Sequence, residues 1–336
     1  MPKLSVEQIT ASLGGGVAGG GALNAPAAPV TFATLDDDLA STKHNVMLWG
    51  APGRGKTTST AFLGNVAAGM APHTRALIIA PERTGLKLSA LRRRGVDTSR
   101  LAVWPNRPGD PITLRGLLAV VAKVKADLET DPLSWAGVGV DTMTALYDVF
   151  LRIAGDDRRA KEPRAARPAS PSGVSLSGTE PETGDYQVAN TTLWKILSDL
   201  WALPCHTVLT AHERDVSASM RVPGYVKFSP ALSPGLVTSL SGGIDVLIHV
   251  RTTDDGASFV GTTTAEPEFL GKDRYGVLPR FLVNPTAERV FAYLDEDITE
   301  DADPEQMVLS EDAGESPLRR VGLTVAEELG RFGAGE

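Results

Sequence analysis

The sequence predicts an α/β fold with a mainly parallel central sheet flanked by helices, and with antiparallel strands toward the C-terminal end. Short apolar runs alternate along the chain with segments whose apolar residues recur at helical spacing, which is the pattern of strand–helix–strand units. A glycine-rich turn separates the first apolar run from the helix that follows it. With 336 residues, 42% of them hydrophobic, the chain can bury a sizeable core.

The expected elements follow these runs in chain order. Buried strands are predicted at residues 46–49, 75–80, 101–104, 136–141 and 207–210, and helices at 57–66, 86–94, 112–128 and 186–201. Three later apolar runs, at 244–251, 258–263 and 280–283, are predicted to be antiparallel strands.

One core is predicted over residues 31–294, with changes of composition at both ends. Residues 1–30 are rich in Gly and Ala, which predicts a flexible arm. Residues 295–336 carry thirteen acidic and three basic side chains, which predicts a solvated acidic tail with a short helix near its end. Two long segments without periodicity, 154–185 and 214–234, predict mobile loops within the core.

Composition argues against a membrane or secreted protein. No apolar run approaches the roughly 20 residues that a membrane-spanning helix needs, and the N-terminus lacks the pattern of a secretory signal. The one cysteine, Cys205, has apolar neighbours and is predicted to be a core thiol. We therefore expect a cytoplasmic protein. The net charge of −8 is concentrated in the tail, so it does not argue against a nucleic-acid partner.

The glycine-rich turn matches the phosphate-binding loop of nucleoside triphosphatases, G-x-x-x-x-G-K-[ST]. A loop of this kind, between a strand and a helix N-terminus, directs several backbone N–H groups at one point, where phosphates bind. Lys56 is expected to reach the β- and γ-phosphates of ATP. The predicted cradle consists of Gly50, Ala51, Pro52, Gly53, Arg54, Gly55, Lys56, Thr57 and Thr58.

An acidic residue at the tip of the strand at 136–141 predicts a site for Mg²⁺. Asp141 ends a short apolar run, and a carboxylate there can hold the metal opposite the Thr57 hydroxyl. Asp141 is followed by Thr142, so no glutamate stands directly beside it to orient the attacking water.

Two polar residues at other strand tips are candidates for the chemistry of hydrolysis. Glu82 ends the strand at 75–80 and is the predicted general base, with a solvated loop glutamate as the alternative. His212 follows the strand at 207–210 and is the predicted γ-phosphate sensor, with a buried, satisfied histidine as the alternative.

The order of these motifs resembles the RecA/Rad core. With Leu209–Glu213, Leu240–Asp245 and Gly271–Gly276 added, residues 44–283 resemble the phage RecA-like ATPases of the Sak single-strand annealing group. The resemblance implies an ATP- and Mg²⁺-dependent protein that binds single-stranded DNA and promotes annealing or recombination in phage DNA metabolism. It also implies a homo-oligomer, ring or filament, with a single-strand-binding protein as a candidate partner.

The resemblance also implies roles for two groups of basic residues. Lys272 and Arg274 resemble fingers that reach the γ-phosphate of a neighbouring subunit. The two irregular segments correspond to DNA-binding loops, and their basic and aromatic residues suit phosphate contact and base stacking. These residues are Arg158, Arg159, Lys161, Arg164, Arg167, Arg214, Arg221, Tyr225, Lys227 and Phe228.

Two other functions are compatible with the same motifs. One is a RecA-fold motor or helicase, although no additional DNA-engaging domain is apparent. The other is a nucleotide switch that acts on protein partners without DNA.

Overall fold

The computed structural model describes residues 43–82, 86–107, 109–161, 181–216, 227–253 and 258–299. The predicted arm at 1–30 lies outside these ranges, as does nearly all of the predicted acidic tail. Within the described part, none of the helices is both long enough and apolar enough to cross a bilayer.

The strands and helices alternate through most of the described chain. The strands are β1 (Asn45–Gly50), β2 (Arg75–Ile79), β3 (Leu101–Trp104), β4 (Trp135–Val140), β5 (His206–Asp215), β6 (Phe228–Pro230), β7 (Val246–Thr252), β8 (Phe259–Thr262), β9 (Lys272–Asp273) and β10 (Phe281–Val283). The α-helices are α3 (Lys56–Ala61), α4 (Leu63–Met70), α5 (Leu88–Arg93), α6 (Leu114–Thr130), α7 (Met143–Lys161), α8 (Thr183–Trp201), α9 (Pro234–Gly243) and α10 (Ala287–Leu294).

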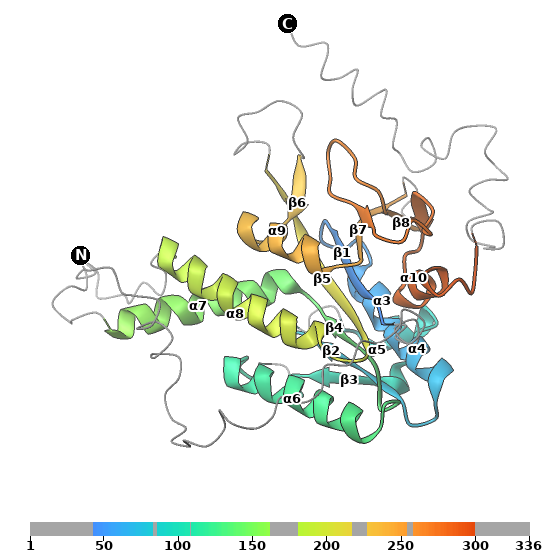
Figure 1. Ribbon diagram of the computed structural model, residues 1–336, viewed down its shortest axis with the longest axis horizontal. Helices are drawn as coiled ribbons and strands as arrows, with labels where there is room; N and C mark the ends of the chain where they lie inside the picture. Colours follow the sequence, from blue (N-terminus) through green and yellow to red (C-terminus); the bar gives the residue numbers. More distant parts are fainter. Residues whose placement is uncertain are drawn as a thin grey trace, which may run out of the picture. The chain divides into compact units, whose positions relative to one another are not determined.

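One sheet joins these strands in the order β10-β8-β7-β1-β5-β4-β2-β3 (Figure 1). Every neighbouring pair from β7 to β3 is parallel, whereas β8 and β10 are antiparallel additions at one edge. The predicted fold class, a mainly parallel sheet flanked by helices with antiparallel strands toward the C-terminal end, is confirmed.

The prediction of an antiparallel strand at 244–251 was wrong. β7 runs parallel to β1, with Trp49 opposite His249 in the register. Helix α9 returns the chain across one face of the sheet before β7 starts, and a crossover of this kind produces a parallel neighbour.

Helices cover both faces of the sheet because its central strands are apolar on both sides. Met47 and Trp49 of β1 pack in one cluster with α6, α7, α8 and α9. Their neighbours Val46 and Leu48 point to the other face and pack with α4 and α10. Figure 1 shows the same division of helices on either side of β1, β5 and β4.

The predicted irregular segments are shorter than expected. Helix α7 continues to Lys161, since Leu151 and Ala154 are buried on its apolar face, and α8 already begins at Thr183. The second segment is also partly regular: β5 extends to Asp215 and pairs with the antiparallel strand β6. Residues 162–180 and 217–226 lie outside the described ranges.

Candidate nucleotide site

The carboxyl ends of β1, β2, β4 and β5 meet at one cavity of about 430 Å³. Parallel strands bring their carboxyl ends to the same edge of a sheet, so residues far apart in sequence converge there. The predicted residues that line this cavity are Pro52, Gly53, Arg54, Gly55, Lys56, Thr57, Thr58, Glu82, Asp141 and His212. The convergence that the sequence predicts for these residues is thus present in the structure.

The loop itself depends on two glycines. The Cα of Gly50 lies so close to the carbonyl oxygen of Val250 in β7 that a Cβ would overlap it. Gly55 has a φ of 77°, in the left-handed region, and a Cβ there would collide with the ring of Phe259. A side chain at either position would displace the loop from its neighbours.

Lys56 is buried beneath the loop that precedes it. Its Nζ donates to the carbonyl oxygens of Gly50 and Ala51, each at 2.7 Å. Burial lowers the pKa of Lys56 to about 8, while the charges of Asp141 and Glu213 act in the opposite direction. The ammonium group therefore lies inside the loop's curve, among the loop residues that line the cavity.

Thr57 and Asp141 face each other as the sequence predicts. The Thr57 hydroxyl donates to Asp141 Oδ2 at 2.7 Å, and the Thr210 hydroxyl on β5 donates to Asp141 Oδ1 at 2.7 Å. A hydroxyl and a carboxylate are hard oxygen donors, which suit Mg²⁺. Thr210 leaves Asp141 little rotational freedom, so the carboxylate is held in place at the rim of the cavity.

His212 and Glu82 also line the cavity. The backbone N–H of His212 donates to Thr144 Oγ1 at 3.0 Å, which fixes the tip of β5. Burial and then the charge of Lys56 lower the pKa of His212, so its ring favours the neutral form. Its Nδ1 is buried and has no hydrogen-bond partner among the described residues. Glu82 is exposed at the end of β2.

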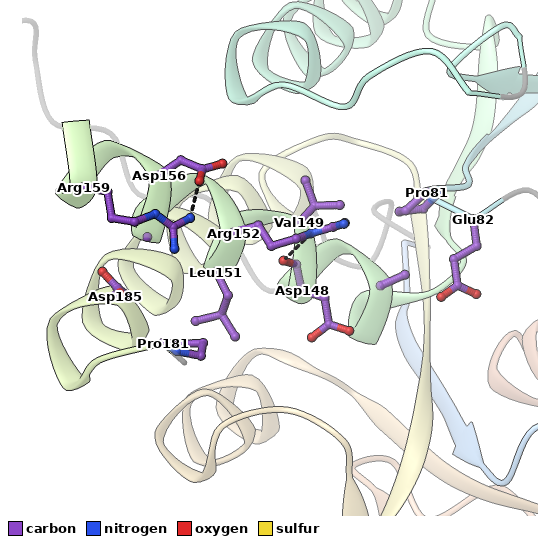
Figure 2. A pocket seen from close by; sticks show the side chains of 12 residues that line it. Pro81, Glu82, Asp148, Val149, Leu151, Arg152, Asp156, Arg159, Pro181 and Asp185 are labelled. Atoms are coloured by element: carbon purple, nitrogen blue, oxygen red, sulfur yellow. Dashed lines mark hydrogen bonds and ion pairs between the residues drawn. The ribbon is translucent and has the colours of Figure 1, made fainter. Parts of the chain in front are cut away.

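A further cavity of about 580 Å³ begins at Glu82 and follows α7 to the first turn of α8 (Figure 2). Its lining mixes acidic and basic side chains, among them Asp148, Arg152 and Asp185. Glu82 lines both this cavity and the phosphate cavity, so its carboxylate stands where the two meet.

Lys272 and Arg274 lie at the opposite end of the sheet from their own phosphate loop. β9 pairs with the first residues of β7, whereas the loop leaves the carboxyl end of β1. Lys272 Nζ donates to the carbonyl oxygens of Ser241 and Ile244, at 2.8 and 2.6 Å, and Arg274 pairs with Asp245 at 2.7 Å. Through these contacts both cations stabilise the C-terminal end of α9 within this chain.

The structure describes only some residues of the first predicted DNA-binding group. Arg158 pairs with Glu182 at 2.8 Å and with the buried Asp185 at 3.2 Å, so its guanidinium joins α7 to α8. Arg159 pairs with Asp156. Both arginines therefore lie on a helix and have ion-pair partners. The prediction of an irregular segment at 154–185 missed this. Lys161 ends α7. The predicted residues outside the described ranges are Arg164, Arg167, Arg221 and Tyr225.

The second group lies on the β5–β6 hairpin, directly beyond the phosphate cavity. Arg214 is exposed on β5 and pairs with Ser229 in the register, two residues after His212. Lys227 lies over the ring of Phe228, with its Nζ 5.1 Å from the ring centroid. The hairpin thus carries the predicted combination of cations and an aromatic ring.

Sequence reasoning missed several residues of this site. Thr210 holds Asp141, and Phe259 covers Gly55, yet neither was predicted to have a role in the site. Thr210 stands in the same strand as His212, so its place at the edge of the sheet could have been inferred. Phe259 comes from β8, about 200 residues after the loop, and no pattern in the sequence links the two.

Comparison with solved structures finds a similarity to a RadB recombinase. The two chains are 13% identical, the match covers 71% of this chain and 84% of that one, and the TM-score is 0.38. No protein-family model and no curated protein matches the sequence. A similarity at this level transfers no function, so the site is described from its own residues: a loop with the G-x-x-x-x-G-K-[ST] pattern at the carboxyl edge of a mainly parallel sheet.

Proposed function

We propose that this chain binds and hydrolyses ATP with Mg²⁺. The observation that carries the proposal is the single cavity where Lys56, Thr57 and Asp141 meet Glu82 and His212. A buried cation and a strand–loop–helix turn suit a polyphosphate. An acid that lines the same cavity suits the activation of water.

Each residue then has a role that follows from its position. Lys56 binds phosphate oxygens, and the Thr57 hydroxyl and Asp141 hold Mg²⁺, which neutralises phosphate charge when bound. Glu82 accepts the proton of the attacking water. The neutral ring of His212 hydrogen-bonds the terminal phosphate through the buried Nδ1 edge or its opposite nitrogen.

A second cavity, next to the one that would hold the phosphates, can accommodate the nucleoside part of ATP. A cavity of about 580 Å³ shares Thr58, Arg94 and Phe259 with the phosphate cavity. Phe62 and Phe259 give it aromatic walls, and Ala292 of α10 lines it as well. Stacking on aromatic rings suits a nucleobase. We therefore assign the base and ribose to this cavity.

Ala292→Phe is expected to weaken ATP binding about tenfold or more, since a phenyl ring fills space that the nucleoside needs. Binding of inorganic tripolyphosphate should be unchanged, because that ligand has no nucleoside. Titration calorimetry with both ligands measures the difference. Ala126→Phe, on the exposed face of α6, is the matched control and should bind both ligands normally. Unchanged ATP binding by Ala292→Phe would place the nucleoside elsewhere.

We propose further that the β5–β6 hairpin binds single-stranded DNA. Arg214, Lys227 and Phe228 supply charge and an aromatic face. Arg214 lies on β5, the strand that carries His212, and β6 pairs with that strand, so DNA and nucleotide would act on one hairpin. Strand annealing in phage recombination and a single-strand-binding protein as partner are proposals that depend on the sequence resemblance alone. A cytoplasmic location is a proposal that depends on composition and the single cysteine.

The DNA proposal predicts salt-dependent binding to oligo-dT. Replacing Arg214 and Lys227 by Ala should make the slope of log K against log salt less negative by about 1.4, the value for two lost phosphate contacts on a single strand. Fluorescence anisotropy at several salt concentrations gives this slope. Ala at Arg115 and Lys195, two exposed helical cations, is the control and should leave the slope unchanged. Absence of any oligo-dT binding at low salt, with or without ATP, would favour a nucleotide switch, and unwinding of a forked duplex would favour a motor.

A homo-oligomer is the remaining part of the proposal. Lys272 and Arg274 lie too far along the sheet to serve their own phosphate loop, so any contact with a γ-phosphate has to be made in a second copy. The Arg274 side chain, 47% exposed, is accessible for such a contact.

A further inference from the structure

A buried histidine–carboxylate pair lies behind the phosphate loop and has no part in the roles assigned above. His249 Nε2 is 2.7 Å from Glu213 Oε2, and Arg251 Nε donates to His249 Nδ1 at 3.3 Å. Because Nδ1 accepts, Nε2 carries the proton and donates it to the Glu213 carboxylate. The tautomer and the orientation of the ring are thus both determined by its neighbours.

The pair crosses β1 at the point where the loop begins. β1 lies between β5 and β7, and Trp49 is opposite Ala211 on one side and His249 on the other. Glu213 stands on β5 one residue beyond the partner of Gly50. The bond between Glu213 and His249 therefore joins the two strands that flank β1, directly beside its last residues.

The ring of His249 packs against two aromatic rings. Its centroid is 4.3 Å from that of Trp49 and 4.5 Å from that of Phe269, and only 1% of the residue is exposed. Burial lowers the pKa of His249, and the hydrogen bond from His249 lowers the pKa of Glu213, so the pair is a neutral ring and a carboxylate. Such a pair has little freedom to rearrange.

The pair is also connected to Lys56, the buried cation of the site. Trp49 directly precedes Gly50, whose carbonyl oxygen accepts from Lys56, and the charge of Glu213 acts on Lys56. Gly50 rests on Val250, the residue after His249. The first turn of the loop is thus supported by the same segment of β7 that holds Glu213.

We propose that Glu213 and His249 are positioning residues. Their hydrogen bond links β5 to β7 across β1 and holds the first turn of the phosphate loop in its binding conformation. Neither residue lines the cavity, and by this proposal neither touches the ligand; they act through Trp49, Gly50 and Lys56. That the ligand is a triphosphate rests on the proposed function.

The test compares triphosphate affinity with stability in matched variants. Glu213→Ala, which removes the acceptor, should weaken binding of ATP and of inorganic tripolyphosphate about tenfold each. Glu213→Gln and His249→Gln, which keep an acceptor and a donor, should retain most of the affinity. Because the two residues act through one bond, Glu213→Ala with His249→Gln should bind no more weakly than Glu213→Ala alone.

Asp295→Ala is the matched control. Asp295 bonds His44 at 2.8 Å beside the first residues of β1, so its loss breaks the same kind of pair at the other end of the strand. Asp295→Ala should lower the Tm and leave both affinities unchanged. If Glu213→Ala lowers the Tm alone and binds both ligands as the wild type does, the pair is merely structural and the proposal is overturned. If the wild-type protein itself binds neither ligand, it is the proposed function that fails.

Discussion

Glu82→Gln is expected to bind ATP with Mg²⁺ as tightly as the wild type and to lose hydrolysis by a factor of about 100 to 10,000, the usual contribution of a general base. The amide has nearly the shape of the carboxylate but accepts no proton from water. Glu82 is exposed at the tip of β2, so the substitution should cost little stability. Steady-state phosphate release and a separate binding titration measure the two effects.

Glu129→Gln provides the control for this variant. Glu129 is an exposed glutamate of α6, away from the cavity, and its substitution should change neither hydrolysis nor binding. Turnover that survives in Glu82→Gln would show that another group orients the water. Loss of binding together with hydrolysis would instead assign Glu82 to the ligand.

Lys56→Ala is expected to abolish measurable turnover and to weaken triphosphate binding on the order of 100-fold, the value for about two charge-assisted hydrogen bonds. Nζ lies within the curve of the loop, bonded to the carbonyl oxygens of Gly50 and Ala51, and Lys56 lines the cavity where phosphates would bind. Calorimetry gives the affinity and phosphate release gives the rate.

Lys43→Ala separates loss of this cation from general damage to β1. Lys43 also donates to two carbonyl oxygens, those of Trp201 and Leu203, but at the other end of the strand. It should lose some stability and keep its affinity and its turnover. Unchanged turnover in Lys56→Ala would mean that the loop is not the phosphate site.

The phosphate loop and the strand tips could be predicted from the sequence because their signals are local. Glycines at fixed offsets, a lysine and a threonine specify a loop that the structure shows between β1 and α3. An acidic or polar residue after each apolar run is enough to place it at the carboxyl edge of a parallel sheet. Asp141, Glu82 and His212 were found in this way.

Other features depend on contacts between distant segments, which periodicity does not reveal. The direction of β7 depends on how α9 crosses the sheet, so an apolar run at 244–251 fits either orientation. Arg158 was assigned to DNA from the basic residues around it and from the family resemblance. Its partner Asp185 lies 27 positions away, beyond a segment without pattern, so the pair could not be recognised in the sequence. Glu213 and His249 are 36 positions apart, and no pattern in the sequence links them.

Binding of ATP to the wild-type protein, measured by calorimetry with and without Mg²⁺ and repeated with Lys56→Ala, tests the central claim most directly. The structure predicts one ATP per chain, tighter binding with Mg²⁺, and a loss on the order of 100-fold in the variant. Absence of ATP binding by the wild type, or equal binding by the wild type and Lys56→Ala, would contradict the assignment of this cavity as a nucleotide site.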